Sequence, residues 1–114
     1  IFFENYQNSL RILNQNIINL KLENKSSIYN FSAYDLENSN LKSVKFDIIF
    51  LDPPFNEKNL NQIMTRIHDS RLLEKNGILI IHRKSNTQDD LIPEFNEVEE
   101  KKYGLSKIIF GKYL

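Results

Sequence analysis

The sequence contains no cysteine and has only three glycines and three prolines. Without cysteine there is no disulfide framework, no thiolate zinc site and no thiol nucleophile, which fits a reducing compartment. The longest apolar run, Ile48–Leu51, is far shorter than the roughly 18 to 20 residues that span a bilayer. The N-terminus does not show a basic segment followed by a long apolar one, which is the pattern of a secretion signal. We therefore expect a cytoplasmic protein without a membrane partner, and we assign no metal site.

A net charge is also missing, because 15 basic and 15 acidic residues cancel. No global field then attracts the chain to nucleic acid or to an anionic membrane, and any RNA contact must come from local patches. The apolar content of 40% excludes the low hydrophobicity of disordered chains. A length of 114 residues is that of one ordinary domain, so we expect a single domain over residues 1–114 and a monomer.

The hydrophobic pattern alternates between strands and helices. Runs rich in β-branched and aromatic residues predict strands at 1–3, 27–31, 46–51 and 78–81. Apolar residues at steps of three and four predict a helix over 6–20 and a second one from Asn59, stopped by Asn76-Gly77. The stretch 32–43 is polar and rich in asparagine, and a hairpin around Tyr103-Gly104-Leu105 closes the chain. This order predicts an α/β fold with a mostly parallel sheet and a C-terminal antiparallel hairpin.

Phe46–Leu51 is the strongest predicted strand, since it is apolar at nearly every position apart from Asp47. That pattern is typical of a central parallel strand covered on both faces. Ligands of such sheets bind outside the carboxyl ends of the strands. One rim is therefore expected to carry the polar residues that follow the predicted strands: Glu4, Asn5, Ser32, Ala33, the segment Asp52-Pro53-Pro54-Phe55, Arg83 and Lys84.

Asp52-Pro53-Pro54-Phe55 is typical of the catalytic loop of an enzyme that methylates an exocyclic amino nitrogen. That nitrogen is a poor nucleophile because its lone pair is delocalised into the ring, and two acceptors on its hydrogens favour a pyramidal, reactive form. The Asp52 carboxylate and the Pro53 carbonyl are the predicted acceptors, on a turn that two prolines stiffen. Phe55 offers a flat face to a base taken out of its stack.

The remaining rim residues each have a simpler explanation beside the functional one. Glu4 and Asn5 stand where a cofactor ribose would bind, but Glu4 also suits the entry of a helix. Ser32 and Ala33 stand where the adenine edge would bind, or form an ordinary loop. Arg83 and Lys84 are predicted to contact RNA phosphates, although a solvated strand end explains them as well.

Three segments resemble a known family. Ile1–Glu4 before the first helix, Phe46–Phe55, and Lys102–Gly111 with its Tyr-Gly-Leu-Ser-Lys-Ile run are similar to the RsmD-like 16S rRNA guanine-N2 methyltransferases of bacteria. The Asp-Pro-Pro-Phe loop is shared with many amino-methyltransferases, so it identifies the chemistry better than the substrate. The Tyr-Gly-Leu-Ser-Lys-Ile hairpin is the feature that singles out the RsmD-like family among them.

The resemblance implies a Rossmann-like class I fold, S-adenosylmethionine as cofactor, and a guanine of 16S rRNA in the small ribosomal subunit as target. It places Glu4 at the cofactor ribose, Ser32 and Ala33 at the adenine, and Asp52–Phe55 at the guanine. The family's first strand, glycine-rich cofactor loop and basic N-terminal elements precede the segment that corresponds to Ile1. We therefore expect a piece of the enzyme that lacks the N-terminal part.

Two alternatives use the same residues. A DNA adenine or cytosine amino-methyltransferase has the same loop type but usually carries an extra target-recognition region, and none is visible in the sequence. A methyltransferase-like module without activity would bind only RNA or a protein, and the presence of Asp52 argues against it.

The resemblance to the RsmD-like family predicts that residues 1–114 alone bind S-adenosylmethionine poorly and are inactive, because the loop that would contact the methionine moiety is missing. Isothermal titration calorimetry of the isolated chain should show no saturable heat. A dissociation constant in the low micromolar range would overturn the prediction.

Overall fold

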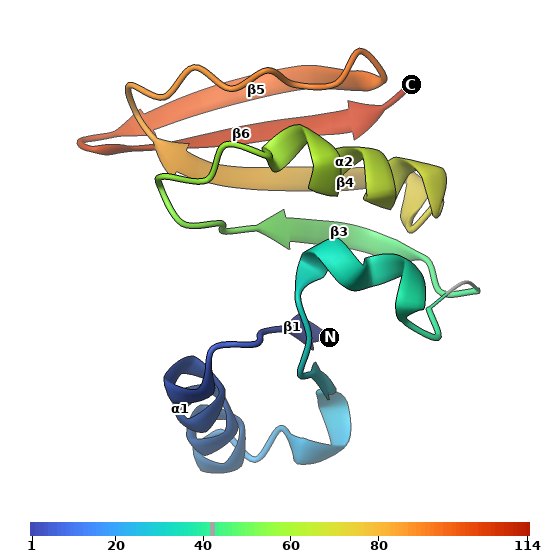
Figure 1. Ribbon diagram of the computed structural model, residues 1–114, viewed down its shortest axis with the longest axis vertical. Helices are drawn as coiled ribbons and strands as arrows, with labels where there is room; N and C mark the ends of the chain where they lie inside the picture. The colour runs from blue at the N-terminus through green and yellow to red at the C-terminus, as the bar shows by residue number, and fades with distance from the viewer. Residues whose placement is uncertain (42) are drawn as a thin grey trace. The chain divides into compact units, whose positions relative to one another are not determined.

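The computed structural model describes residues 1–41 and 43–114. Lys42, within the polar stretch predicted at 32–43, lies outside the described residues. The chain divides into two compact groups, Ile1–Asn38 and Ser39–Leu114, and each has its own sheet (Figure 1). A single domain over residues 1–114 therefore stays a prediction.

The first group is built on two short parallel strands. β1 (Phe2–Phe3) pairs with β2 (Ile28–Tyr29), and α1 (Gln7–Asn19) and the 3₁₀ turn η1 (Glu23–Lys25) connect them. A second 3₁₀ segment, η2 (Ala33–Asn38), follows β2. The rings of Phe3, Tyr29 and Phe31 pack against one another, with centroids 5.1 to 5.6 Å apart. This aromatic cluster stabilises a pair of strands that is too short to be stable alone.

The second group is a four-stranded sheet with one helix. Its elements are β3 (Phe46–Leu51), α2 (Leu60–Asp69), β4 (Leu73–Lys84), β5 (Phe95–Tyr103) and β6 (Ser106–Tyr113). The strand order is β3-β4-β6-β5, with β3 parallel to β4 and the other pairs antiparallel. The predicted C-terminal hairpin is thus present, and the sheet is mixed.

The core of the second group lies between α2 and one face of this sheet (Figure 1). Met64 of α2 and Leu79, Ile81 and Ile109 of the sheet are almost completely buried. The buried residues of β4 alternate with more exposed ones, as expected for a strand with one covered face.

The prediction that Phe46–Leu51 is central and covered on both faces is wrong for this sheet. β3 is the outer strand of the second group, and Ile48 and Phe50 are 63% and 55% exposed. Within residues 39–41 and 43–114, α2 is the one helix that packs on the sheet. In this group, therefore, only one face of the sheet is covered, although β3 is apolar at nearly every position.

The predicted helix stop at Asn76-Gly77 is also wrong. α2 ends at Asp69, and Arg71 adopts a left-handed conformation with φ +51°. The Arg71 N–H donates to the His68 carbonyl and the Leu72 N–H to that of Ile67, which is a Schellman motif. An arginine occupies the position where glycine is the usual signal.

Asn76 and Gly77 lie inside β4 instead. A Cβ atom on Gly77 would lie 2.9 Å from Leu73 Cγ and 3.0 Å from the Asp47 carbonyl oxygen. The glycine therefore permits a close approach between β3 and β4 and does not end a helix.

Tyr113 ties the last strand to α2, and it predicts an alkaline loss of stability. Its hydroxyl donates to the Met64 carbonyl at 2.8 Å, and burial, followed by the charge of Asp69, raises the pKa of Tyr113 above its usual value of about 10. Above pH 10 the unfolded state therefore binds fewer protons than the folded state, so the free energy of unfolding falls as the pH rises.

Tyr113→Phe should lower the free energy of unfolding at pH 7 by about 1 kcal/mol, because one hydrogen bond is lost. Above pH 10 the variant should lose less stability than the native chain. Urea unfolding between pH 7 and 11 measures both effects. Equal pH dependence in the two proteins would contradict the assigned burial of the phenol.

Candidate active site

The loop after β3 presents Asp52 at the carboxyl end of the strand. Leu51 pairs with Ile81 in the β3–β4 register, so Asp52 lies beside His82. One oxygen of the carboxylate, Oδ1, lies 2.8 Å from His82 Nδ1, and the Asp52 side chain is 59% exposed. The bond requires the proton on Nδ1, since an ionised carboxylate is only an acceptor. No partner of Oδ2 is found among the described residues.

The ring of Phe55 packs against the same histidine, His82. It meets the His82 imidazole edge to face, with centroids 5.4 Å apart and an interplanar angle of 74°. Phe55 is exposed despite this contact. The imidazole of His82 therefore contacts both the predicted acceptor and the predicted stacking ring.

A tight turn carries the Phe55 ring. The Glu57 N–H donates to the Pro54 carbonyl at 2.9 Å, which closes a four-residue turn over Pro54–Glu57. The Glu57 carboxylate accepts from the Asn59 N–H at 2.7 Å, at the entry to α2. Both ends of the turn are thus held by hydrogen bonds.

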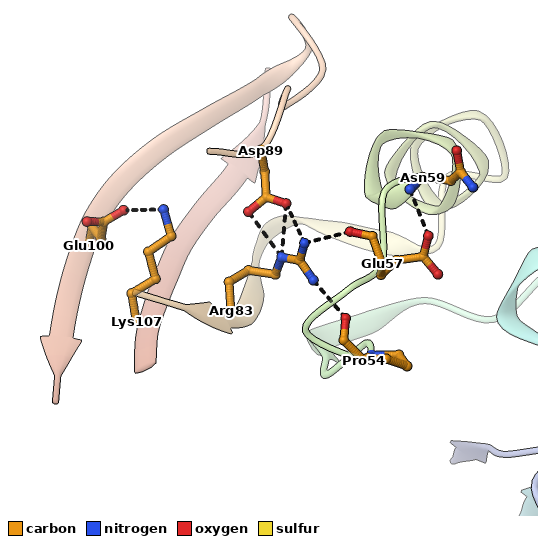
Figure 2. A network of polar contacts seen from close by, with 7 residues as sticks. All are labelled: Pro54, Glu57, Asn59, Arg83, Asp89, Glu100 and Lys107. Atoms are coloured by element: carbon orange, nitrogen blue, oxygen red, sulfur yellow. Dashed lines mark hydrogen bonds and ion pairs between the residues drawn. The ribbon is translucent and has the colours of Figure 1, made fainter. Parts of the chain in front are cut away.

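Arg83 is completely buried behind this turn (Figure 2). Its guanidinium donates to the Pro54 carbonyl at 3.1 Å, to the Glu57 carbonyl at 2.7 Å, and through Nε and Nη2 to the Asp89 carboxylate at 2.7 to 3.0 Å. Through these bonds the guanidinium of Arg83 points into the protein and away from solvent. The prediction that Arg83 contacts RNA phosphates does not agree with this burial, whereas Lys84 is exposed.

A pocket of about 300 Å³ opens beside the turn. It lies between the loop after β3, the start of α2 and the loop after β4. Phe55, Leu60 and polar side chains of both loops, including Gln88 and Asp90, line it. An exposed aromatic ring next to amide and carboxylate groups gives this pocket the chemistry of a base-binding surface.

The first group places the predicted cofactor residues at the ends of its parallel strands. Glu4 and Asn5 follow β1, and Ser32 and Ala33 follow β2. Because the strands are parallel and paired, their carboxyl ends share one edge.

The carboxylate of Glu4 accepts the N–H groups of Asn5 and Tyr6 through Oε1, at 2.9 and 2.8 Å. The hydroxyl of Ser32 accepts the Tyr34 N–H at 3.2 Å. Both side chains therefore shape the local backbone, as the simpler explanation requires. Their roles in cofactor binding stay predictions.

The sequence predicted neither the contact of His82, which stands beside the predicted phosphate-binding residues Arg83 and Lys84, with Asp52 nor that of Asp89 with Arg83. Only the β3–β4 register could have identified His82. Because Leu51 pairs with Ile81, the residues that follow them, Asp52 and His82, lie side by side. Asp89 gave no such signal, since its partner depends on the path of an irregular loop. The described residues contain no cluster of three or more metal-ligating side chains and no helix long and apolar enough to cross a bilayer.

The sequence profile of the family described as conserved hypothetical protein 95 matches residues 1–112. A Rickettsia prowazekii protein named as an uncharacterized methylase, RP545, is 33% identical over 75 residues, which are 65% of this chain and 31% of that protein. YlbH of Bacillus subtilis, named as a candidate rRNA methyltransferase, is 24% identical over 98% of this chain and 62% of its own length. The chain thus spans less than two thirds of either relative.

A solved structure shares the architecture. The Escherichia coli protein yhhF, named as a candidate methyltransferase, superposes with a TM-score of 0.77 at 19% identity, over 97% of this chain and 60% of that one. Such a likeness shows the fold, and it confirms the predicted class I methyltransferase architecture. With the profile match over nearly the whole sequence, the chain belongs to the conserved hypothetical protein 95 family, the RsmD-like family that the sequence predicts.

Proposed function

We propose that this chain supplies the base-binding and amine-activating part of an enzyme that methylates the N2 amino group of a guanine in 16S rRNA. The observation that carries the proposal is the arrangement of Asp52, His82 and Phe55 at the carboxyl end of β3. An oriented carboxylate beside an exposed aromatic ring is what an extruded nucleobase with an exocyclic amine requires.

Asp52 accepts one hydrogen of the amino group. His82 holds Oδ1, so Oδ2 is the oxygen that faces the substrate. The Pro53 carbonyl is the second acceptor, because the Pro54 carbonyl already accepts from Glu57 and Arg83. With both hydrogens held, the nitrogen lone pair turns out of the ring plane toward the methyl donor.

No strong base is needed in this reaction. The amino nitrogen loses its proton only as it becomes cationic, so an ionised carboxylate is sufficient to hold that proton and pass it to solvent. His82 keeps the carboxylate in one orientation, as a hydrogen-bonded neighbour of a reacting group commonly does. Phe55 stacks on the base, which offsets the few kcal/mol needed to extrude it.

S-adenosylmethionine supplies the methyl group when it is bound. The side chains of the first group fit the adenosine part of this cofactor. Glu4 uses Oε1 for its backbone hydrogen bonds, which leaves Oε2 to suit the ribose hydroxyls, and Asn5, Ser32 and Ala33 lie at the same strand ends. A carboxylate after a parallel strand is the usual ribose partner in such folds.

RNA as the substrate is supported by the name of the Bacillus subtilis relative. Lys84, exposed at the end of β4, is the remaining predicted phosphate contact. We propose in addition that the substrate is carried by the small ribosomal subunit and that the enzyme is a cytoplasmic monomer. The rival, DNA amino-methylation, would use the same loop, and a direct assay on both nucleic acids separates the two.

Asp52→Ala tests the assigned acceptor. In the complete gene product that contains this chain, kcat for methyl transfer to 16S rRNA or small subunits should fall by roughly 100-fold or more. Asp47→Ala, which removes an exposed carboxylate of the same strand, should leave kcat unchanged. Transfer of tritiated methyl groups measures both, and full activity of Asp52→Ala would reject the role of Asp52.

Phe55→Ala tests the stacking ring separately. The loss of base stacking should raise KM for RNA by roughly 10-fold or more, because stacking is worth about 1 to 3 kcal/mol per base. KM for S-adenosylmethionine should not change. Phe55→Tyr keeps the aromatic face and serves as the matched control, and a similar KM in both variants would speak against stacking.

A further inference from the structure

Arg83 combines complete burial with bonds to two separate loops. Its side chain is 0% exposed, and that of its partner Asp89 is 7% exposed. The arginine extends from β4, Asp89 from the loop after β4, and both bonded carbonyls from the loop after β3 (Figure 2). The planar guanidinium is suited to this task, since its donors point in fixed directions.

The two carbonyls that Arg83 binds are the two ends of one turn. Pro54 and Glu57 are the first and last residues of the turn that carries Phe55. A hydrogen bond to each end fixes the orientation of the whole turn relative to β4, in addition to the bond that closes it. The ring of Phe55 is therefore placed through the backbone of the turn that Arg83 holds.

The charges match this arrangement. A buried guanidinium is costly unless it is paired and hydrogen-bonded. Lys107, opposite Arg83 in the β4–β6 register, is also largely buried and has its own partner, Glu100, at 3.3 Å. Each buried cation thus has a separate carboxylate, so Asp89 is the acid that compensates Arg83.

His82 and Arg83 are consecutive in β4, so their side chains point to opposite faces of the sheet. His82 holds Asp52 on one face, and Arg83 holds Pro54 and Glu57 on the other. Two neighbouring residues of β4 therefore hold the beginning and the end of the same loop.

We propose that Arg83, anchored by Asp89, is a positioning residue that fixes the Pro54–Glu57 turn and thereby places Phe55 beside Asp52 for the target base. The inference rests on the proposed function and extends it to a residue that touches neither substrate nor cofactor. Arg83 acts through the turn. Its loss should therefore affect the chemical step and RNA binding, but not the affinity for S-adenosylmethionine.

The test uses Arg83→Lys and Asp89→Asn in the complete gene product, with Glu100→Gln as the matched control. Arg83→Lys keeps the charge but loses the fork that reaches both carbonyls, so kcat for RNA methylation should fall about 100-fold, as for a reacting group misplaced by about 1 Å. KM for S-adenosylmethionine should stay within twofold. Glu100→Gln removes the charged partner of the neighbouring buried cation, Lys107, and should leave kcat within twofold.

Amide hydrogen exchange supplies a readout that does not depend on activity. In Arg83→Lys and Asp89→Asn the exchange rate of the Glu57 N–H should rise at least 10-fold, while that of Ile81 in β4 should not change. An unchanged Glu57 rate, or a raised rate with native kcat, would overturn the positioning role. If Arg83→Lys does not fold, Asp89→Asn, which keeps one side-chain oxygen as acceptor, decides the question.

The two proposals fail in different ways. A native protein that transfers no methyl group to RNA contradicts the proposed function. The exchange rates then still decide whether Arg83 holds the turn. Native activity together with unaffected variants contradicts only the positioning role.

Discussion

The buried guanidinium of Arg83 is the constraint on which the site depends. A charge with no exposed surface is stable in a protein only when carboxylate and carbonyl groups surround it, and here these groups come from the loops after β3 and β4. The arrangement cannot form unless both loops are in place. One ion therefore joins the chain segment that carries Asp52 and Phe55 to the strand and loop that support it.

The two prolines make this junction possible. Neither Pro53 nor Pro54 has an N–H group, so the loop cannot continue the β3–β4 ladder and has few ways to satisfy its own carbonyls. The Pro54 carbonyl is therefore available to Arg83 and to the Glu57 N–H. Pro54, which has no N–H, offers no donor that competes for the Pro53 carbonyl. A loop of more flexible residues would lose more conformational entropy on adopting this geometry.

The elements with strong local patterns were predictable, and the long-range contacts were not. Periodicity located both helices, the β3 strand before Asp52 and the C-terminal hairpin, because these depend on neighbours in sequence. It failed at the end of α2, where Arg71 adopts a conformation usually left to glycine. The burial of Arg83 was not predicted either, since a basic residue at a strand end is usually solvated. Only Asp89, which is distant from the strand in its loop, explains this burial.

The burial of Arg83 removes one basic group from the surface of the second group. Several lysines near the hairpin have acidic neighbours: Lys101 lies 3.5 Å from Glu99, and Lys102 and Lys107 lie 3.5 and 3.3 Å from Glu100. With Arg83 bound to Asp89, carboxylates engage these four basic groups of the second group. Stacking on Phe55 and hydrogen bonds to Asp52 are short-range and act only on an extruded base. In the proposed reaction, the contacts of Phe55 and Asp52 would therefore select the shape and amino group of that base.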